Sequence, residues 1–217
     1  MSTTSSFECR ICAVASGRYA LGGADRPWLE NERYLALTSI GPLVEGWTLA
    51  VPRTHSLNLL NDYTDASFVR FVRNALSVIE AAYGSAVVFE HGAQCEGSAT
   101  SCGTSHAHLH IVPLKFSLQR EAVRFDRSLK WFRCSLNSIK ERVGHQEYLF
   151  VADRYEGAET TGEVCVLQSG QSQFFRRVIA ERLGLRGESD YKTHPNLATA
   201  EVGSNNLSLL SRRLKAA

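Results

Sequence analysis

The chain of 217 residues has a hydrophobic content of 44%, which is enough for a buried core in one large domain or in a domain with an appendage. This composition excludes a disordered or fibrous protein. Its 24 basic and 22 acidic residues give a net charge of +2, which does not favour broad binding to nucleic acids or membrane surfaces. We therefore expect a polyanionic ligand to bind at a local site.

The cysteine content and the absence of long apolar runs indicate a cytoplasmic protein. No apolar run is long enough for a membrane span, and the first residues show no charged-then-apolar leader. Six cysteines are too few for a secreted disulfide scaffold of this length. In a reducing compartment a close pair more often serves metal or redox chemistry, so Cys9 and Cys12, spaced C-x-x-C, are the first candidates.

The first part of the chain is predicted to have the element order β-β-α-β-β. Short runs rich in β-forming residues predict four strands, over residues 33–39, 47–52, 85–90 and 107–114. Between the second and the third strand, apolar residues recur at helical spacing over residues 64–83, and Gly84 follows them. A polar loop over residues 92–105 joins the last two strands.

A second block, roughly residues 117–217, shows another pattern and contains no evident internal repeat or low-complexity tract. Its periodicity predicts a helix over residues 128–143, strands over 148–152 and 163–167, a helix over 171–183 and a last helix near 207–214.

The segment from His106 to Val112 carries the most informative pattern. Side chains of a strand alternate between its two faces, so His106, His108 and His110 are predicted to share one face while the apolar residues between them face a core. Chance placement of three of the seven histidines has little weight. Two interpretations remain: the imidazoles share a catalytic zinc ion, or one is structural and the others serve nucleophilic and phosphate-binding chemistry.

The sequence HAHLHIV resembles the motif His-φ-His-φ-His-φ-φ, with φ apolar, of the histidine triad (HIT) superfamily of nucleotide hydrolases and transferases. Residues 46–55, GWTLAVPRTH, are similar to the family's Gly-His-x-Leu-φ-φ-Pro-Lys-x-His strand, with Trp47 and Arg53 as departures. Residues 88–93 resemble the Glu-Asn-Gly turn of the galactose-1-phosphate uridylyltransferase branch, with His91 in place of Asn.

This resemblance covers about residues 7–114 and implies a HIT-like α+β fold with an antiparallel sheet flanked by helices. Residues 1–116 are then expected to form the catalytic core with its zinc site. Residues 117–217 are expected to form a C-terminal extension of a helix, two strands and further helices packed on that core. The resemblance also implies a homodimer, unless the extension occupies the sheet edge at which family members join.

The resemblance supplies a role for the C-x-x-C pair. In zinc-bearing members this pair, the His of the Pro-x-x-His element and the first triad His bind one metal. Carried over by motif, the zinc ligands are Cys9, Cys12, His55 and His106. Two thiolates and two imidazoles form a closed tetrahedral set, which suits a structural zinc. A lost or empty site is the alternative, and a Cys9–Cys12 redox pair is a weaker one because no thioredoxin-like βαβ context surrounds it.

The resemblance also implies the catalytic roles. His108 matches the nucleophile, which attacks the α-phosphorus and forms a nucleotidyl-histidine. His110 is positioned to donate to the phosphoryl oxygens as they gain charge. Thr104 and Ser105, directly before the triad, are candidates for contacts with a phosphate or with the leaving-group oxygen, and simple loop polarity explains them equally well.

Three arginines complete the candidate substrate-binding residues: Arg53, Arg176 and Arg177. The last two belong to the basic, aromatic motif FFRRVIA and are candidates for clamping a distal phosphate or leaving group, although the solvated face of an amphipathic helix explains them as well. The nucleoside pocket is expected to draw on residues 34–43, where no ribose-binding acid is evident.

The third triad position favours a hydrolase. Transferase and phosphorylase branches often have Gln there, whereas His110 is typical of branches that use water. We therefore expect a HIT hydrolase that cleaves at the α-phosphate of a nucleotide conjugate or dinucleoside polyphosphate. A nucleotidyltransferase or phosphorylase of the same chemistry is the first alternative. A zinc-stabilised nucleotide-binding module without turnover is the second, and the intact His108 and His110 argue against it.

Overall fold

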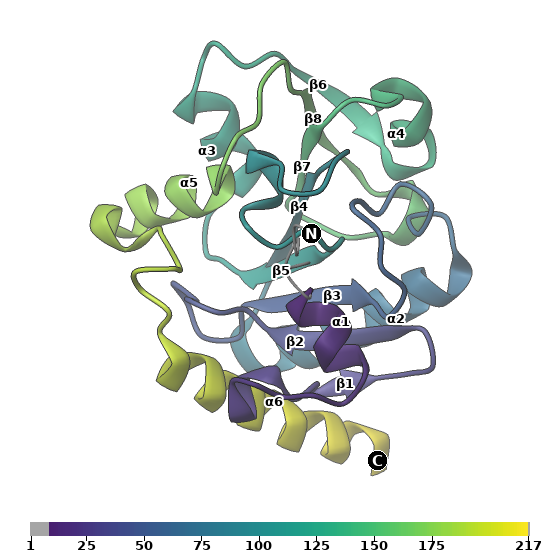
Figure 1. Cartoon of the computed structure of the whole chain (residues 1–217), viewed down its shortest axis with the longest axis vertical. Coiled ribbons are helices and arrows are strands. Elements are labelled where there is room, and N and C mark those ends of the chain that lie inside the picture. The colour runs from purple at the N-terminus through teal and green to yellow at the C-terminus, as the bar shows by residue number, and fades with distance from the viewer. Residues whose placement is uncertain (1–8, 217) are drawn as a thin grey trace, which may run out of the picture.

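The computed structural model describes residues 9–216 and is built around one antiparallel sheet (Figure 1). The strands are β1 (Leu29–Glu30), β2 (Tyr34–Thr38), β3 (Thr48–Pro52), β4 (Ala86–Gly92), β5 (Leu109–Pro113), β6 (Trp131–Ser135), β7 (Tyr148–Ala152) and β8 (Thr161–Val166). The α-helices are α1 (Arg10–Ala15), α2 (Ala66–Tyr83), α3 (Leu118–Phe125), α4 (Leu136–Val143), α5 (Phe174–Leu183) and α6 (Leu197–Ala216).

All eight strands belong to one sheet with the order β1-β2-β3-β5-β4-β7-β8-β6. Every neighbouring pair is antiparallel. Figure 1 shows the sheet running from β1 at the bottom to β6 at the top. The expected α+β class, with an antiparallel sheet flanked by helices, is confirmed.

The elements predicted for the first part of the chain are present, with ends shifted by a few residues. Helix α2 begins after Asp65, whose carboxylate accepts hydrogen bonds from the backbone N–H groups of Ser67 at 2.7 Å and Phe68 at 3.3 Å. Such a cap satisfies N–H groups that have no partner within the helix. Gly84 follows α2 with a φ of +86°, which ends the helix at the residue that the sequence indicates.

The helix predicted over residues 128–143 is wrong in its first half. Trp131–Ser135 forms strand β6, which pairs with β8, and α4 begins only at Leu136. The side chain of Ser135 accepts a hydrogen bond from the N–H of Asn137 and caps α4. The aromatic residues Trp131 and Phe132 fit a pleated strand because they pack into opposite cores. The structure also contains α1, α3 and β1, which the periodicity does not predict.

Helices cover both faces of the sheet and form two cores. Buried side chains of α2 and α4, with Leu207 of α6, pack on one face. Buried side chains of α1, α3 and α5 pack on the other. Strand β5 contributes side chains to both cores, because Ile111 packs in the first and Val112 in the second. The triad segment is therefore held between two packed layers.

The two parts of the chain repeat one element order around the central β4–β7 pair. The first contains β3-α2-β4-β5-α3, and the second contains β6-α4-β7-β8-α5. The strand order β3-β5-β4 is mirrored by β7-β8-β6. Helices α2 and α4 lie on one face of the sheet, and α3 and α5 lie together on the other. We call these five-element units the first and the second half; their topology repeats although their sequences do not.

The expected boundary near residue 116 falls between β5 and α3, yet the sheet continues across it through the β4–β7 pair. The division into a core (1–116) and an extension (117–217) stays a prediction, and residues 1–8 and 217 lie outside the described residues. The homodimer and the cytoplasmic location also stay predictions; β7 of the same chain occupies the edge of β4. In the part of the chain that the structure describes, no helix is both long and apolar enough to cross a membrane.

Candidate active site and metal centre

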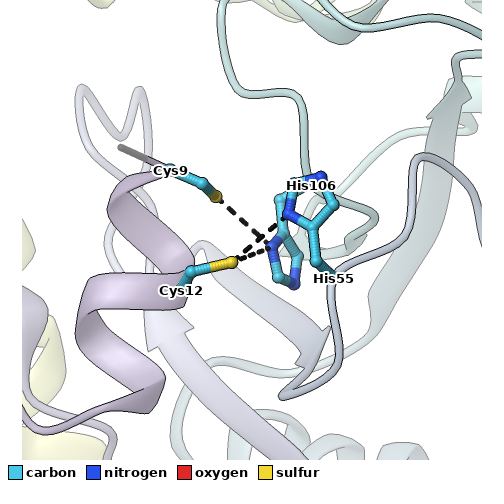
Figure 2. Close-up of side chains that lie close together, drawn as sticks. All are labelled: Cys9, Cys12, His55 and His106. Carbon is cyan, nitrogen blue, oxygen red and sulfur yellow. Dashed lines mark hydrogen bonds between the residues drawn. The ribbon is translucent and has the colours of Figure 1, made fainter. Parts of the chain in front are cut away.

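Cys9, Cys12, His55 and His106 converge beside α1 (Figure 2). Cys9 directly precedes α1 and Cys12 lies in its first turn, while the two histidines lie in the segments that follow β3 and precede β5. The Cys9 Sγ lies 3.4 Å from the His106 Nδ1, and the Cys12 Sγ lies 3.3 Å from the His55 Nδ1 and 3.6 Å from the His106 Nδ1. All four donor atoms lie within 4.8 Å of one another.

These four side chains have the geometry of a metal site. Zinc bond lengths of about 2.3 Å to sulfur and about 2.0 Å to nitrogen place tetrahedral S and N donors about 3.6 Å apart, close to the observed spacing. The other ring nitrogens are also engaged, because the His106 Nε2 donates to the Pro52 carbonyl and the His55 Nε2 to the Glu96 carboxylate, both at 2.8 Å. Such partners leave the lone pair on Nδ1, as metal-binding histidines require. The cluster can therefore hold a metal ion.

A narrow cavity of about 50 Å³ lies beside the triad. It is lined by Arg10, Ser39, Ile40, Leu49, His91, Ser101, Cys102, Thr104, His108, His110, Arg176 and Tyr191. The lining includes two arginines and three histidines and no carboxylate. Arg176 comes from α5 of the second half and Tyr191 from the segment after it, so both parts of the chain build the cavity.

His108 lines this cavity directly before β5 begins. Its Nδ1 lies 2.7 Å from the carbonyl oxygen of His106. A carbonyl only accepts, so Nδ1 carries the proton. Burial lowers the pKa of His108, although its hydrogen bond to the His106 backbone acts in the opposite direction. The neutral ring therefore has its free electron pair on Nε2. Ala107 and Leu109 on either side are buried in the first core and hold the segment in place.

His110 has the opposite tautomer. The indole Nε1–H of Trp47 donates to the His110 Nδ1 at 2.9 Å, and an indole can only donate. Burial lowers the pKa of His110 well below its ordinary value, so the ring is neutral and its proton lies on Nε2. The ring stacks on Phe89 with a centroid distance of 4.3 Å. Trp47, a departure from the HIT motif, thus turns His110 into a fixed hydrogen-bond donor.

His91 is a third neutral imidazole at the cavity. Its Nε2 accepts from the backbone N–H of Phe175 at 3.5 Å, across the contact between β4 and α5. Burial lowers the pKa of His91 to about 3, so the proton lies on Nδ1. This Nδ1 is buried and has no hydrogen-bond partner among residues 9–216. Resemblance to the Glu-Asn-Gly turn identified His91 as a departure, but it did not predict a place in the site.

The structure brings Thr104 to the cavity, but not Ser105 or Arg53. The Ser105 Oγ accepts from the Gly97 N–H at 2.9 Å and so stabilises the preceding loop. Arg53 donates to the carbonyls of Ala15 and Asn31, at 3.1 and 2.9 Å, and pairs with a glutamate of β1. Its contact with Ala15 fixes the end of α1, the helix that contains Cys12 and follows Cys9.

The two neighbouring arginines of α5 separate. Arg176 is buried and lines the cavity. Arg177 lies on the exposed face of α5, over the rings of Phe125 and Phe174, and donates to the side chain of Gln171 at 3.2 Å. The clamp interpretation is thus compatible with the position of Arg176, and the solvated-face interpretation with that of Arg177.

Besides His91, sequence reasoning did not place five further cavity residues in the site: Arg10, Leu49, Ser101, Cys102 and Tyr191. The Arg10 Nε donates to the buried carboxylate of Asp25 at 2.9 Å, and its place inside the C-x-x-C motif was the available signal. Cys102 is structural: its sulfur accepts from the Gln173 N–H at 3.0 Å, and burial raises the pKa of its thiol to about 11. Tyr191 reaches the cavity from far along the chain, which no local pattern can predict.

Comparison with known proteins leaves the function open. No protein-family profile and no curated protein matches the chain. Among solved structures, part of it is similar to a Hit-like protein involved in cell-cycle regulation from Bartonella henselae, with unknown ligand. The two are 24% identical, and the match covers 40% of this chain and 67% of that chain with a TM-score of 0.33. Such a low TM-score carries no argument about function, so a functional assignment depends on the site.

Proposed function

We propose that this chain is a histidine triad hydrolase that forms a covalent nucleotidyl-histidine at His108. The supporting observation is the pair of complementary tautomers on one cavity wall. His108 offers a nucleophilic lone pair on Nε2, and His110 offers a donor on its Nε2. A nucleophile beside a fixed donor is the arrangement that phosphoryl substitution requires, because charge develops on the phosphoryl oxygens.

The first step forms a bond between the His108 Nε2 and the α-phosphorus and breaks the bond from that phosphorus to the leaving group, which departs with the electron pair. The ring of His108 is then substituted on Nε2 and protonated on Nδ1, so it carries positive charge. The carbonyl of His106 accepts from that Nδ1–H and stabilises the charge. In the second step water attacks the phosphorus, the N–P bond breaks, and the water proton is lost from the nucleoside monophosphate product.

We further propose that the metal held by Cys9, Cys12, His55 and His106 is a structural zinc. Two thiolates and two imidazoles suit zinc and fill a tetrahedral set. When bound, zinc would fix the His106 ring and leave no position for a catalytic water. The backbone of His106 would in turn hold His108 in its reactive tautomer.

The proposal is tested by intact-protein mass spectrometry after rapid, acid-free quenching with nucleotide conjugates of each common nucleobase. We expect the wild-type protein to gain the mass of one nucleotidyl group and His108→Ala to gain none. The melting temperature and metal content of His108→Ala should remain those of the wild type. An adduct of equal yield on His108→Ala would remove the nucleophile assignment.

The acceptor is identified in the same reactions. In ¹⁸O-labelled water a hydrolase puts the label into the nucleoside monophosphate. In phosphate buffer a phosphorylase instead releases a nucleoside diphosphate, and a transferase needs another phosphorylated acceptor. We expect labelled monophosphate in both media, because the third triad position is a histidine. A diphosphate product would favour the phosphorylase alternative.

A further inference from the structure

Arg176 is a buried cation that the second half of the chain places at the cavity. The residue is 4% exposed and lines the cavity together with His108 and His110. Its guanidinium carbon lies 4.9 Å from the ring centroid of Trp47 and 5.7 Å from that of Tyr191. Aromatic faces attract a cation, so these two rings hold the guanidinium beside the reacting imidazoles.

Two backbone carbonyls fix the orientation of the guanidinium. The Arg176 Nε donates to the Ser189 carbonyl at 2.9 Å, and Nη2 donates to the Gly41 carbonyl. The Gly41 N–H in turn donates to the Pro195 carbonyl at 2.7 Å. Gly41 has a φ of +63°, and a Cβ there would lie 2.6 Å from the Cβ of Tyr191. The close contact between this turn and residues 189–195 therefore preorganises Arg176.

No carboxylate forms an ion pair with Arg176 in the part of the chain that the structure describes. Its Nη1 meets no acceptor there, and Asp190 acts only through longer-range attraction. Burial lowers the pKa of Arg176 to about 10, so it stays charged at neutral pH. A buried charge without a counter-ion is costly. Arg10, the other cation of the cavity, already pairs with Asp25.

A second donor at this cavity is also unsatisfied. His91 is 6% exposed, and its Nδ1 has no partner among the described residues. Its Nε2 accepts from Phe175, the chain neighbour of Arg176, so both donors belong to the contact between β4 and α5. Buried donors in native proteins are normally satisfied. A ligand group rich in negatively charged oxygens would satisfy both.

Building on the nucleotidyl transfer proposed above, we propose that Arg176 and His91 bind an anionic leaving group, so that the enzyme prefers phosphoric anhydrides to phosphoramidates. When the His108 Nε2 attacks an anhydride, the bond from the α-phosphorus to the bridging oxygen breaks. The electron pair stays on that oxygen, and a phosphate or polyphosphate anion leaves without needing a proton. An amine leaving group must take up a proton. No carboxylic acid lines the described cavity, and its neutral imidazoles His91 and His110 are poor acids.

The test compares two substrates that share a nucleoside: a dinucleoside tetraphosphate and the nucleoside 5′-phosphoramidate of a primary amine. The ratio of their kcat/KM values is measured for the full-length, metal-containing wild type, for Arg176→Met, and for the control Arg182→Met. Arg182 lies on the same helix but is exposed and off the cavity. We expect Arg176→Met to lower the anhydride preference about 100-fold, as loss of a charge-stabilising donor does, and Arg182→Met to preserve it.

A second measurement is independent of turnover. Inorganic pyrophosphate should bind the wild type and bind Arg176→Met at least about tenfold more weakly in calorimetry. If Arg176→Met melts below the assay temperature, Arg176→Lys replaces it in both measurements. Arg176→Lys should also lower the anhydride preference, because an ammonium cannot reproduce the guanidinium geometry that the two carbonyls hold.

The outcomes separate the two proposals. Adducts at His108 with an unchanged ratio in Arg176→Met, or with both rates lowered equally, would overturn the leaving-group assignment and leave nucleotidyl transfer standing. If no substrate forms an adduct while pyrophosphate binding still depends on Arg176, the anion subsite stands and nucleotidyl transfer is rejected.

Discussion

The first and the second half of this protein share one topology but divide the chemistry unequally. In the first half, His106 and His108 precede β5 and His110 lies in it. His55 and His106 also join Cys9 and Cys12, at α1, in the cluster that could hold a metal ion. The corresponding strand of the second half, β8, reads TGEVCV and contains no histidine. The second half instead supplies Arg176 to the cavity and the backbone N–H of Phe175 that donates to His91.

This difference shows that the element order alone does not gather histidines at a cavity. Both halves place a helix on each face of three antiparallel strands. Only the first also positions imidazoles with complementary tautomers, through Trp47 and the His106 carbonyl. The second half contributes Arg176 to this cavity and, among the described residues, no histidine.

Loss of the proposed structural zinc should have the largest effect on stability, and it should act on the segments that carry its ligands. Cys12→Ser removes one of four ligands and should abolish stoichiometric metal binding. A metal present at about 1,000 times its Kd stabilises the folded state by about 4 kcal/mol. In a protein of this size the melting temperature should then fall by about 10 °C. Differential scanning calorimetry and metal analysis measure both quantities.

The matched control is Cys95→Ser, since Cys95 is an exposed cysteine outside the cluster. It should leave the metal content and the melting temperature unchanged. Hydrogen exchange gives the spatial prediction: in Cys12→Ser, residues 53–58 and 104–108 should lose protection while β6 and β8 keep theirs. Uniform loss of protection would show that the two halves unfold as one unit, and full metal content in Cys12→Ser would reject the ligand set.

Glu90 joins the halves from the opposite face of the sheet. Its buried carboxylate accepts from the hydroxyls of Tyr63 and Tyr148, one from each half, and from the Leu59 N–H at 2.8 Å. Burial raises the pKa of Glu90 from 4.5 to about 7, although these three hydrogen bonds act in the opposite direction. The folded state therefore keeps a proton that the unfolded chain releases at lower pH.

The wild-type protein should therefore lose stability as the pH rises. The stability that this group contributes is fully present below about pH 4.5 and is lost as the pH rises through about 7. The difference in pKa corresponds to on the order of 3 kcal/mol. Relative to Glu90→Gln, which has no such proton, the wild type should lose this amount of unfolding free energy between pH 4.5 and 8. Urea denaturation of both proteins across that range measures it, and parallel stability curves would contradict the prediction.

Sequence patterns predict helices and strands, whose signals lie within a few residues. They do not predict contacts between segments that are far apart in the chain. Alternating apolar residues, helical spacing and the stop at Gly84 reveal strands and helices because each signal lies within a few residues. The cluster of Cys9, Cys12, His55 and His106 could be predicted because the resemblance joined three short motifs. The positions of Arg176 and Tyr191 depend instead on the β4–β7 pairing and on the contact of residues 189–195 with Gly41, which have no sequence period.

Substitution of Trp47 should have the smallest and most specific effect, a change in kcat. Trp47→Phe removes the donor to the His110 Nδ1, so the imidazole is no longer held in the tautomer with its proton on Nε2. We expect kcat to fall about tenfold, or about 1.4 kcal/mol, which is the net worth of one hydrogen bond. The ¹⁵N shifts of the His110 ring should show mixed tautomers, a change that loss of packing alone would not produce.

Trp47→His distinguishes the hydrogen bond from packing. Trp47 is fully buried, so both variants leave a cavity, and the larger phenylalanine fills more of it than histidine does. Packing alone therefore predicts the greater loss of kcat for Trp47→His. If the donor matters, the imidazole at position 47 should restore it and retain more kcat than Trp47→Phe, even where its melting temperature is lower. If the kcat of Trp47→His is equal to or lower than that of Trp47→Phe, Trp47 acts through packing alone and does not fix the tautomer of His110.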